Sequence, residues 1–223
     1  MSALVEPPLD FTYAPAPTRV VFADGALARL PDEVDRLGLE RVLVISTPDQ
    51  RGQAEQIAAD LGRRAAGVHA EAVMHVPVET VDAALAVTGE HHVDGCVTVG
   101  GGSTVGLGKA LALREGLPVV AVPTTYAGSE MTPVWGLTEA GQKRTGRDPR
   151  VLPRAVIYDP TLSASLPAGL SVTSGMNAIA HATNGTLRGI PFGRTIATTA
   201  EDSTQTVVAE TATPRISSKL PGT

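Results

Sequence analysis

Cysteine, basic charge and long apolar runs are all scarce in this 223-residue chain. The single cysteine, Cys96, excludes an internal disulfide, and its place in an apolar run predicts a small buried core residue without chemistry of its own. A formal net charge of −5 argues against nucleic acid or an anionic membrane as the main partner, because both require a basic face. No apolar run approaches the roughly 20 residues of a membrane span.

The start of the chain also lacks the features of an export signal. Residues 1–11 are acidic and contain two prolines, and no basic segment precedes an apolar one. The sequence therefore predicts a cytoplasmic protein.

Apolar runs and helix-like segments alternate along the chain, a pattern typical of a parallel sheet with helices on both faces. We expect strands or helices at residues 41–45, 53–61, 68–73, 81–88, 96–99, 105–113 and 117–122, with further strands or a hairpin at 134–137 and 156–158. The sequence thus predicts an α/β fold with a doubly wound parallel sheet. In such sheets ligands bind beyond the carboxyl ends of the strands, which brings together the loops at 46–49, 100–104 and 124–132.

Three consecutive glycines follow the strand at 96–99. Gly100, Gly101 and Gly102 allow backbone N–H groups to approach an anion, and the helix that follows adds partial positive charge at the same place. The spacing matches neither the common G-x-G-x-x-G fingerprint nor a P-loop. The segment up to Ser103 therefore predicts a pyrophosphate site of a less common type.

Longer stretches of the chain resemble the iron-containing alcohol dehydrogenase superfamily, and within it the maleylacetate reductase family. The resemblance runs from about Phe11 to Ala182. Its motifs are residues 100–103 with Lys109, 123–132, 143–148, 151–153, 158–160 and 174–182. Gly106 stands where general alcohol dehydrogenases of the superfamily have an aspartate.

The resemblance implies an NAD(P)-binding domain over residues 1–160, with NADH or NADPH as cofactor. It implies that residues 100–103 contact the pyrophosphate, that Lys143 lies near the nicotinamide ribose, and that three hydroxyl residues line the cofactor cleft: Thr124, Thr125 and Ser129. The adenosine ribose is expected near Ser46, and Asp49 would repel a 2′-phosphate, which favours NADH.

Asn177 and His181 are spaced to share one face of a helix, where superfamily members place two metal ligands. A neutral amide is a poor ligand for a divalent cation, so we expect no metal site. His181 is then the candidate catalytic residue, donating a hydrogen bond or a proton to the reacting oxygen.

The resemblance further implies hydride transfer to the carbon–carbon double bond of maleylacetate, which gives 3-oxoadipate in the degradation of aromatic compounds. This substrate is a dicarboxylate, and the densest basic cluster of the chain is a candidate to bind it: Lys143, Arg144, Arg147 and Arg150. Relatives associate as dimers, which makes a homodimer possible here.

After Ala182 the resemblance stops. Residues 161–182 are expected to begin a helical domain with an uncovered apolar stripe, and residues 183–223, with ten threonines and no histidine, are expected to form an aberrant, poorly ordered tail. Three interpretations follow: a truncated maleylacetate reductase with impaired turnover, another alcohol- or glycerol-dehydrogenase-like member of the superfamily, or a nucleotide-binding fragment without catalysis.

Overall fold

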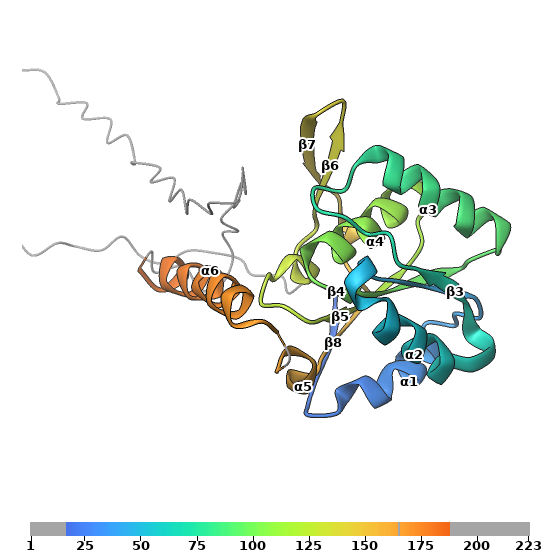
Figure 1. Ribbon diagram of the computed structural model, residues 1–223, viewed down its shortest axis with the longest axis horizontal. Helices are drawn as coiled ribbons and strands as arrows, with labels where there is room; N and C mark the ends of the chain where they lie inside the picture. Colours follow the sequence, from blue (N-terminus) through green and yellow to red (C-terminus); the bar gives the residue numbers. More distant parts are fainter. Residues whose placement is uncertain (1–16, 165, 188–223) are drawn as a thin grey trace, which may run out of the picture. The chain divides into compact units, whose positions relative to one another are not determined.

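The computed structural model describes residues 17–164 and 166–187, which fall into two compact units divided after Leu166. The first unit alternates strands and helices (Figure 1). Its elements are β1 (Arg19–Phe22), α1 (Leu30–Arg36), β2 (Val42–Ile45), α2 (Arg51–Leu61), β3 (Ala65–His69), α3 (Val78–Glu90), β4 (Gly95–Gly100), α4 (Gly102–Glu115), β5 (Val119–Pro123), β6 (Val134–Glu139), β7 (Gln142–Arg147), β8 (Ala155–Tyr158) and α5 (Pro160–Ser163).

Six of these strands form one parallel sheet in the order β1-β8-β5-β4-β2-β3. The chain runs outward from β2 to β3, returns to the other side of β2 as β4, and then runs outward again through β5. The reversal lies between β2 and β4, and the carboxyl ends of those two strands are therefore the place where a ligand-binding crevice is expected.

The strands are apolar throughout because both faces of the sheet are covered. Val42 and Val44 pack with Ile57 of α2 on one face, while Leu43 and Ile45 pack with Leu111 of α4 on the other. Figure 1 shows α1 and α2 on one side of the sheet and α3 and α4 on the other. The arrangement confirms the predicted doubly wound α/β class.

Two predicted boundaries differ from the structure, and two elements carried no prediction. The strand expected at residues 68–73 is β3 and ends at His69, and the helix expected from Val105 begins at Gly102. The segments that form β1 and α1 carried no prediction. For β1 the reason is that it is a four-residue edge strand with three exposed residues. The segment at 134–147 is a separate antiparallel hairpin of β6 and β7, closed by Ala140 and Gly141 with positive φ angles.

The second unit contains helix α6 (Ala168–Leu187). Because α6 continues through Gly185, the helix does not end where the family resemblance ends. The predicted tail lies outside the described residues from position 188 onward. No helix in the described part of the chain is both long and apolar enough to cross a membrane.

Candidate nucleotide site

The three glycines after β4 have different roles at the reversal point. Gly100 has a φ of 146°, and a Cβ there would lie 2.4 Å from Thr104 Oγ1 and 2.6 Å from Gln50 Oε1. A Cβ on Gly101 would meet the Thr125 side chain at 3.0 Å. Gly102 has open space around its Cβ position and is exposed. The first two glycines therefore permit close packing, and the third leaves the start of α4 accessible.

The N-terminus of α4 has the properties of an anion site. It is the start of a 14-residue helix, its N-cap residue Gly101 supplies no side-chain cap, and the backbone N–H groups of the first turn point out of the helix. Thr104, fully buried in this first turn, has a hydroxyl without a hydrogen-bond partner among the described residues. An anion with several acceptor oxygens, such as a diphosphate, would satisfy the free backbone N–H groups.

Gln50 is a site residue that the sequence analysis did not identify. It ends the short 3-10 helix η2 (Pro48–Gln50) after β2, and its Nε2 donates to Thr124 Oγ1 at 2.9 Å. The Oε1 atom accepts from Thr47 Oγ1 at 3.4 Å. Gln50 thus bridges the ends of β2 and β5 beside Gly100. Its position after β2 was the available signal, but a lone glutamine in a loop has no chemical signature.

The hydroxyl loop after β5 forms the second wall of the site. Thr124 is buried, and its N–H donates to the Gly100 carbonyl at 3.1 Å, while Thr125 contacts the Gly101 position. Gly128 takes a φ of 75° and starts the 3-10 helix η4 (Ser129–Met131). The structure therefore brings Gly100, Gly101, Thr124 and Thr125 together.

Lys109 lies in the same motif but contacts the loop instead of the start of α4. It is 1% exposed, and its Nζ donates to the carbonyls of Ser129 at 2.6 Å, Thr132 at 2.8 Å and Val134 at 2.8 Å. Burial lowers the pKa of this ammonium to about 8, while the nearby carboxylate of Glu130 acts in the opposite direction. Lys109 therefore fixes the loop against α4.

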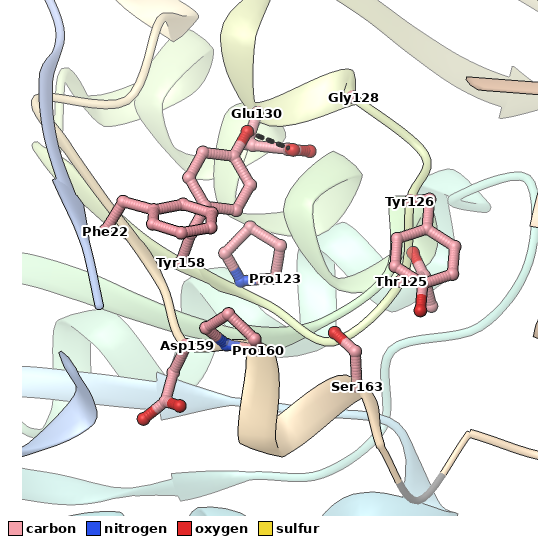
Figure 2. A pocket seen from close by; sticks show the side chains of 10 residues that line it. All are labelled: Phe22, Pro123, Thr125, Tyr126, Gly128, Glu130, Tyr158, Asp159, Pro160 and Ser163. Atoms are coloured by element: carbon pink, nitrogen blue, oxygen red, sulfur yellow. Dashed lines mark hydrogen bonds between the residues drawn. The ribbon is translucent and has the colours of Figure 1, made fainter. Parts of the chain in front are cut away.

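A cavity of about 380 Å³ opens beside this loop, at the carboxyl ends of β5 and β8. Figure 2 shows Phe22 and Tyr158 on one side, Thr125 and Tyr126 on the other, and the rings of Pro123 and Pro160 between them. The hydroxyl of Tyr158 donates to Glu130 Oε1 at 2.6 Å, and burial raises the pKa of Tyr158 above its usual range. The cavity is lined mainly by apolar and aromatic surface, which suits a planar ring.

Of the residues predicted to contact the cofactor, Ser46 is buried and Lys143 lies on the hairpin of β6 and β7. Ser46 follows β2 as expected, but it is fully buried and its hydroxyl donates to the Thr47 carbonyl at 3.0 Å. Lys143 lies exposed on β7, opposite Thr138 in the hairpin. Ser103 is half-buried in the first turn of α4, and Ser129 is half-buried with its carbonyl bonded to Lys109.

The basic cluster at 143–150 is partly neutralised within the hairpin and the turn that follows. Arg144 pairs with Glu139 at 3.1 Å, and Arg150 pairs with Asp148 at 2.7 Å. Hydrogen bonds from Arg150 lower the pKa of the Asp148 carboxyl. Two of the four cations in this cluster are therefore paired with neighbouring carboxylates.

Asn177 and His181 both lie on α6, in the second unit, and the side chain of His181 is outside the described part of the chain. Within residues 17–164 and the described portion of α6, no three His, Cys, Asp or Glu side chains are grouped to hold a metal ion. Since Asn177 offers only a neutral amide, this pair of side chains does not fit a divalent metal.

Gly106, one turn into α4, packs directly against the segment before α3. A Cβ at this position would lie 2.7 Å from Val76 Cγ2. Val76 is itself held with a positive φ of 46°, and its carbonyl accepts from the N–H of Thr138 in β6. The close approach of Val76 gives a packing reason for glycine at this position.

Comparison with known proteins agrees with this architecture. Maleylacetate reductase of Sphingobium indicum is 58% identical over 177 residues, which cover 79% of this chain and 50% of that protein. A crystal structure of maleylacetate reductase from Agrobacterium tumefaciens superposes with a TM-score of 0.77 at 52% identity, covering 78% of this chain and 50% of that one. Sulfoacetaldehyde reductase from Bifidobacterium kashiwanohense, solved in complex with NAD⁺, superposes with a TM-score of 0.73 at 25% identity, covering 80% and 54%.

This chain spans about half the length of the relatives that it matches. The family model for iron-containing alcohol dehydrogenase matches residues 17–160, which is more than half of the chain. The chain therefore belongs to the iron-containing alcohol dehydrogenase family.

Proposed function

We propose that this chain binds a reduced nicotinamide dinucleotide, with the diphosphate at the N-terminus of α4. The observation that carries the proposal is the uncapped start of α4 at the reversal point of the sheet, where Gly102 leaves the backbone N–H groups accessible. A relative at 25% identity that was solved with NAD⁺ points to the same ligand class.

The remaining parts of the dinucleotide have suitable surroundings. Thr125 separates the start of α4 from the cavity, so a ligand whose diphosphate lies at α4 can place one ring system in the cavity. The hydroxyl of Thr125 can bond a phosphate or ribose oxygen, and Gln50 can bond a second one across Gly100.

For the protein as a whole, we propose the reaction of a maleylacetate reductase, located in the cytoplasm. The cofactor supplies the hydride for the carbon–carbon double bond of the dicarboxylate, and a proton completes the reduction. Arg147 and Lys143 are the members of the basic cluster proposed to bind the substrate carboxylates, and His181 is proposed to donate to the developing oxyanion.

The test is calorimetric titration of the folded chain with NADH, followed by an assay with NADH and maleylacetate. We expect saturable binding of one NADH per chain. We expect turnover far below that of a full-length reductase. Hydride transfer requires the acceptor to be held about 3–3.5 Å from the nicotinamide, and the chain tested spans only about half the length of its relatives. A flat titration on folded protein would exclude the proposal, and turnover equal to that of a full-length enzyme would exclude the low activity.

The preference for NADH is proposed to depend on Asp49, an exposed residue of η2 next to Gln50. A carboxylate near the adenosine ribose repels a 2′-phosphate but not a 2′-hydroxyl. We expect Asp49→Asn to improve NADPH affinity by about three- to tenfold and to leave NADH affinity unchanged, as for removal of one partly screened charge. Titrations with both nucleotides measure the ratio, and an unchanged ratio contradicts this role.

Association into homodimers is also proposed, with the apolar stripe of α6 as a contributor. Val172 is 65% exposed and Met176, one helical turn later, is 58% exposed. We expect Val172→Lys combined with Met176→Lys to lower the sedimentation coefficient from that of a dimer toward that of a monomer. Equal sedimentation of both proteins would show that this stripe does not contribute.

A further inference from the structure

One buried charge in the first unit takes no part in the proposed ligand contacts. Among the residues that the structure describes, Lys109 is the largest fully buried side chain, and it lies on the same helix as the proposed diphosphate site. Placing an ammonium in an apolar interior is costly unless oxygen atoms surround it. The hydrogen bonds of Lys109 therefore show what this charge holds in place.

All the hydrogen-bond acceptors of Lys109 belong to the segment that connects β5 to β6. Besides the three carbonyls of Ser129, Thr132 and Val134, the hydroxyls of Thr132 and Ser129 lie 3.2 and 3.4 Å from Nζ. The ammonium has three N–H bonds, so each carbonyl can receive one of them. Ser129 is the first residue of η4, Thr132 follows η4 directly, and Val134 begins β6.

The same segment forms a wall of the nucleotide site. Gly128 and Glu130 line the cavity, and Thr125, just before them, contacts Gly101 at the start of α4. Glu130 is fixed from the opposite side by the hydroxyl of Tyr158. Lys109 therefore joins the helix that receives the diphosphate to the loop that faces the rest of the ligand.

We propose that Lys109 is a positioning residue of the nucleotide site, whose ammonium holds the loop of residues 124–134 against α4 so that both walls contact one dinucleotide. This inference rests on the proposed function. It predicts that loss of the ammonium weakens dinucleotide binding in a chain that remains folded, because the loop no longer keeps its distance from α4.

The test uses Lys109→Met, which keeps an unbranched side chain of similar length without charge, and Arg114→Met as the matched control. Arg114 lies on the same helix and is exposed, so its loss changes the net charge equally without touching the loop. We expect the Lys109 variant, folded by circular dichroism, to bind NADH about tenfold more weakly, while the control binds like the unmodified chain.

Trp135 provides a readout in the absence of ligand. It is the only tryptophan, it follows Val134 directly, and its indole packs on Gly146 of the hairpin. We expect its emission to shift in the Lys109 variant and not in the control. Unchanged emission and unchanged NADH affinity in the Lys109 variant would overturn the proposal, as would a shift in emission without a loss of affinity.

The pH dependence of the unmodified chain gives a second test. Since burial lowers the pKa of Lys109 to about 8, the ammonium predominates below this pH and the neutral amine above it. We expect Trp135 emission to titrate with a midpoint near pH 8 and NADH affinity to fall over the same range. A fall in NADH affinity over this range without a change in Trp135 emission would overturn the proposal.

The pH profile of the Lys109 variant is the control for the other ionisable groups near this loop. Glu130 lies beside Lys109, Tyr158 donates to Glu130, Arg147 faces Val134 in the hairpin, and His75 bonds Thr138 through its carbonyl. They remain in the Lys109 variant, so a transition that they cause appears in both profiles. If the unmodified chain binds no NADH at all, the proposed function and the ligand part of this inference both fail. Trp135 emission then shows by itself whether Lys109 holds the loop.

Discussion

Gly102→Asp is expected to weaken dinucleotide binding strongly while leaving the fold as stable as before or more stable. Gly102 is the first residue of α4, is exposed, and has no heavy atom within 4 Å of its Cβ position. A carboxylate there is favourable for the helix dipole, by about 0.3–1 kcal/mol. The same carboxylate would occupy the position proposed for the diphosphate.

The size of the effect follows from the charges. Two unit charges about 4 Å apart repel by about 4 kcal/mol at the effective dielectric constant of a protein surface. Since each 1.4 kcal/mol changes affinity tenfold, we expect NADH binding to weaken by at least about 100-fold. Calorimetric titration measures the affinity, and thermal unfolding measures the stability.

Gly102→Asn is the control, because it has nearly the same shape without the charge. We expect the Asn variant to lose less than about tenfold in affinity, from crowding alone. If the Asp and Asn variants bind NADH equally, the diphosphate does not lie at the N-terminus of α4. If the Asp variant binds NADH more weakly but is more stable than the unmodified chain, the lost affinity comes from a ligand contact and not from a folding defect.

The central part of the sheet could be predicted from sequence because its strands are buried on both faces. The apolar runs that form β2, β4 and β5 are continuous, and each ends at a glycine, proline or hydroxyl residue. The glycine run could likewise be predicted, since three glycines after such a strand indicate close backbone approach. The edge strand β1 was missed because it lacks a continuous apolar pattern and pairs only with β8.

The side-chain contacts of the site could not be predicted in the same way. Gln50 reaches Thr124 from 74 positions away, and Lys109 contacts loop residues that lie 20, 23 and 25 positions downstream. Such contacts depend on the order of strands in the sheet, which local patterns do not specify. The ion pairs of the basic cluster could not be predicted either: Arg144 pairs with Glu139 and Arg150 with Asp148, and a run of cations in sequence does not specify such partners.

Gly108→Ala is expected to destabilise the fold strongly, although alanine normally favours a helix. Gly108 lies in the middle of α4, where the helix crosses the sheet, and a Cβ there would lie 2.4 Å from Thr98 Cγ2 and 3.4 Å from Val119 Cγ1. Thr98 and Val119 are both buried, on β4 and β5. Accommodating the methyl group requires α4 to move away from the sheet, at a cost of about 1–3 kcal/mol for an overpacked core.

The matched control is Gly89→Ala in the last turn of α3, an exposed position with no heavy atom within 4 Å of the Cβ site. There we expect alanine to stabilise the chain by up to about 1 kcal/mol, through its higher helix propensity. Denaturant unfolding of both variants gives the two free energies of unfolding. Because the proposed diphosphate site lies on α4, the Gly108 variant should bind NADH more weakly even at temperatures where it is folded. If both substitutions stabilise the chain equally, α4 lies farther from Thr98 of β4 and Val119 of β5 than the structure shows.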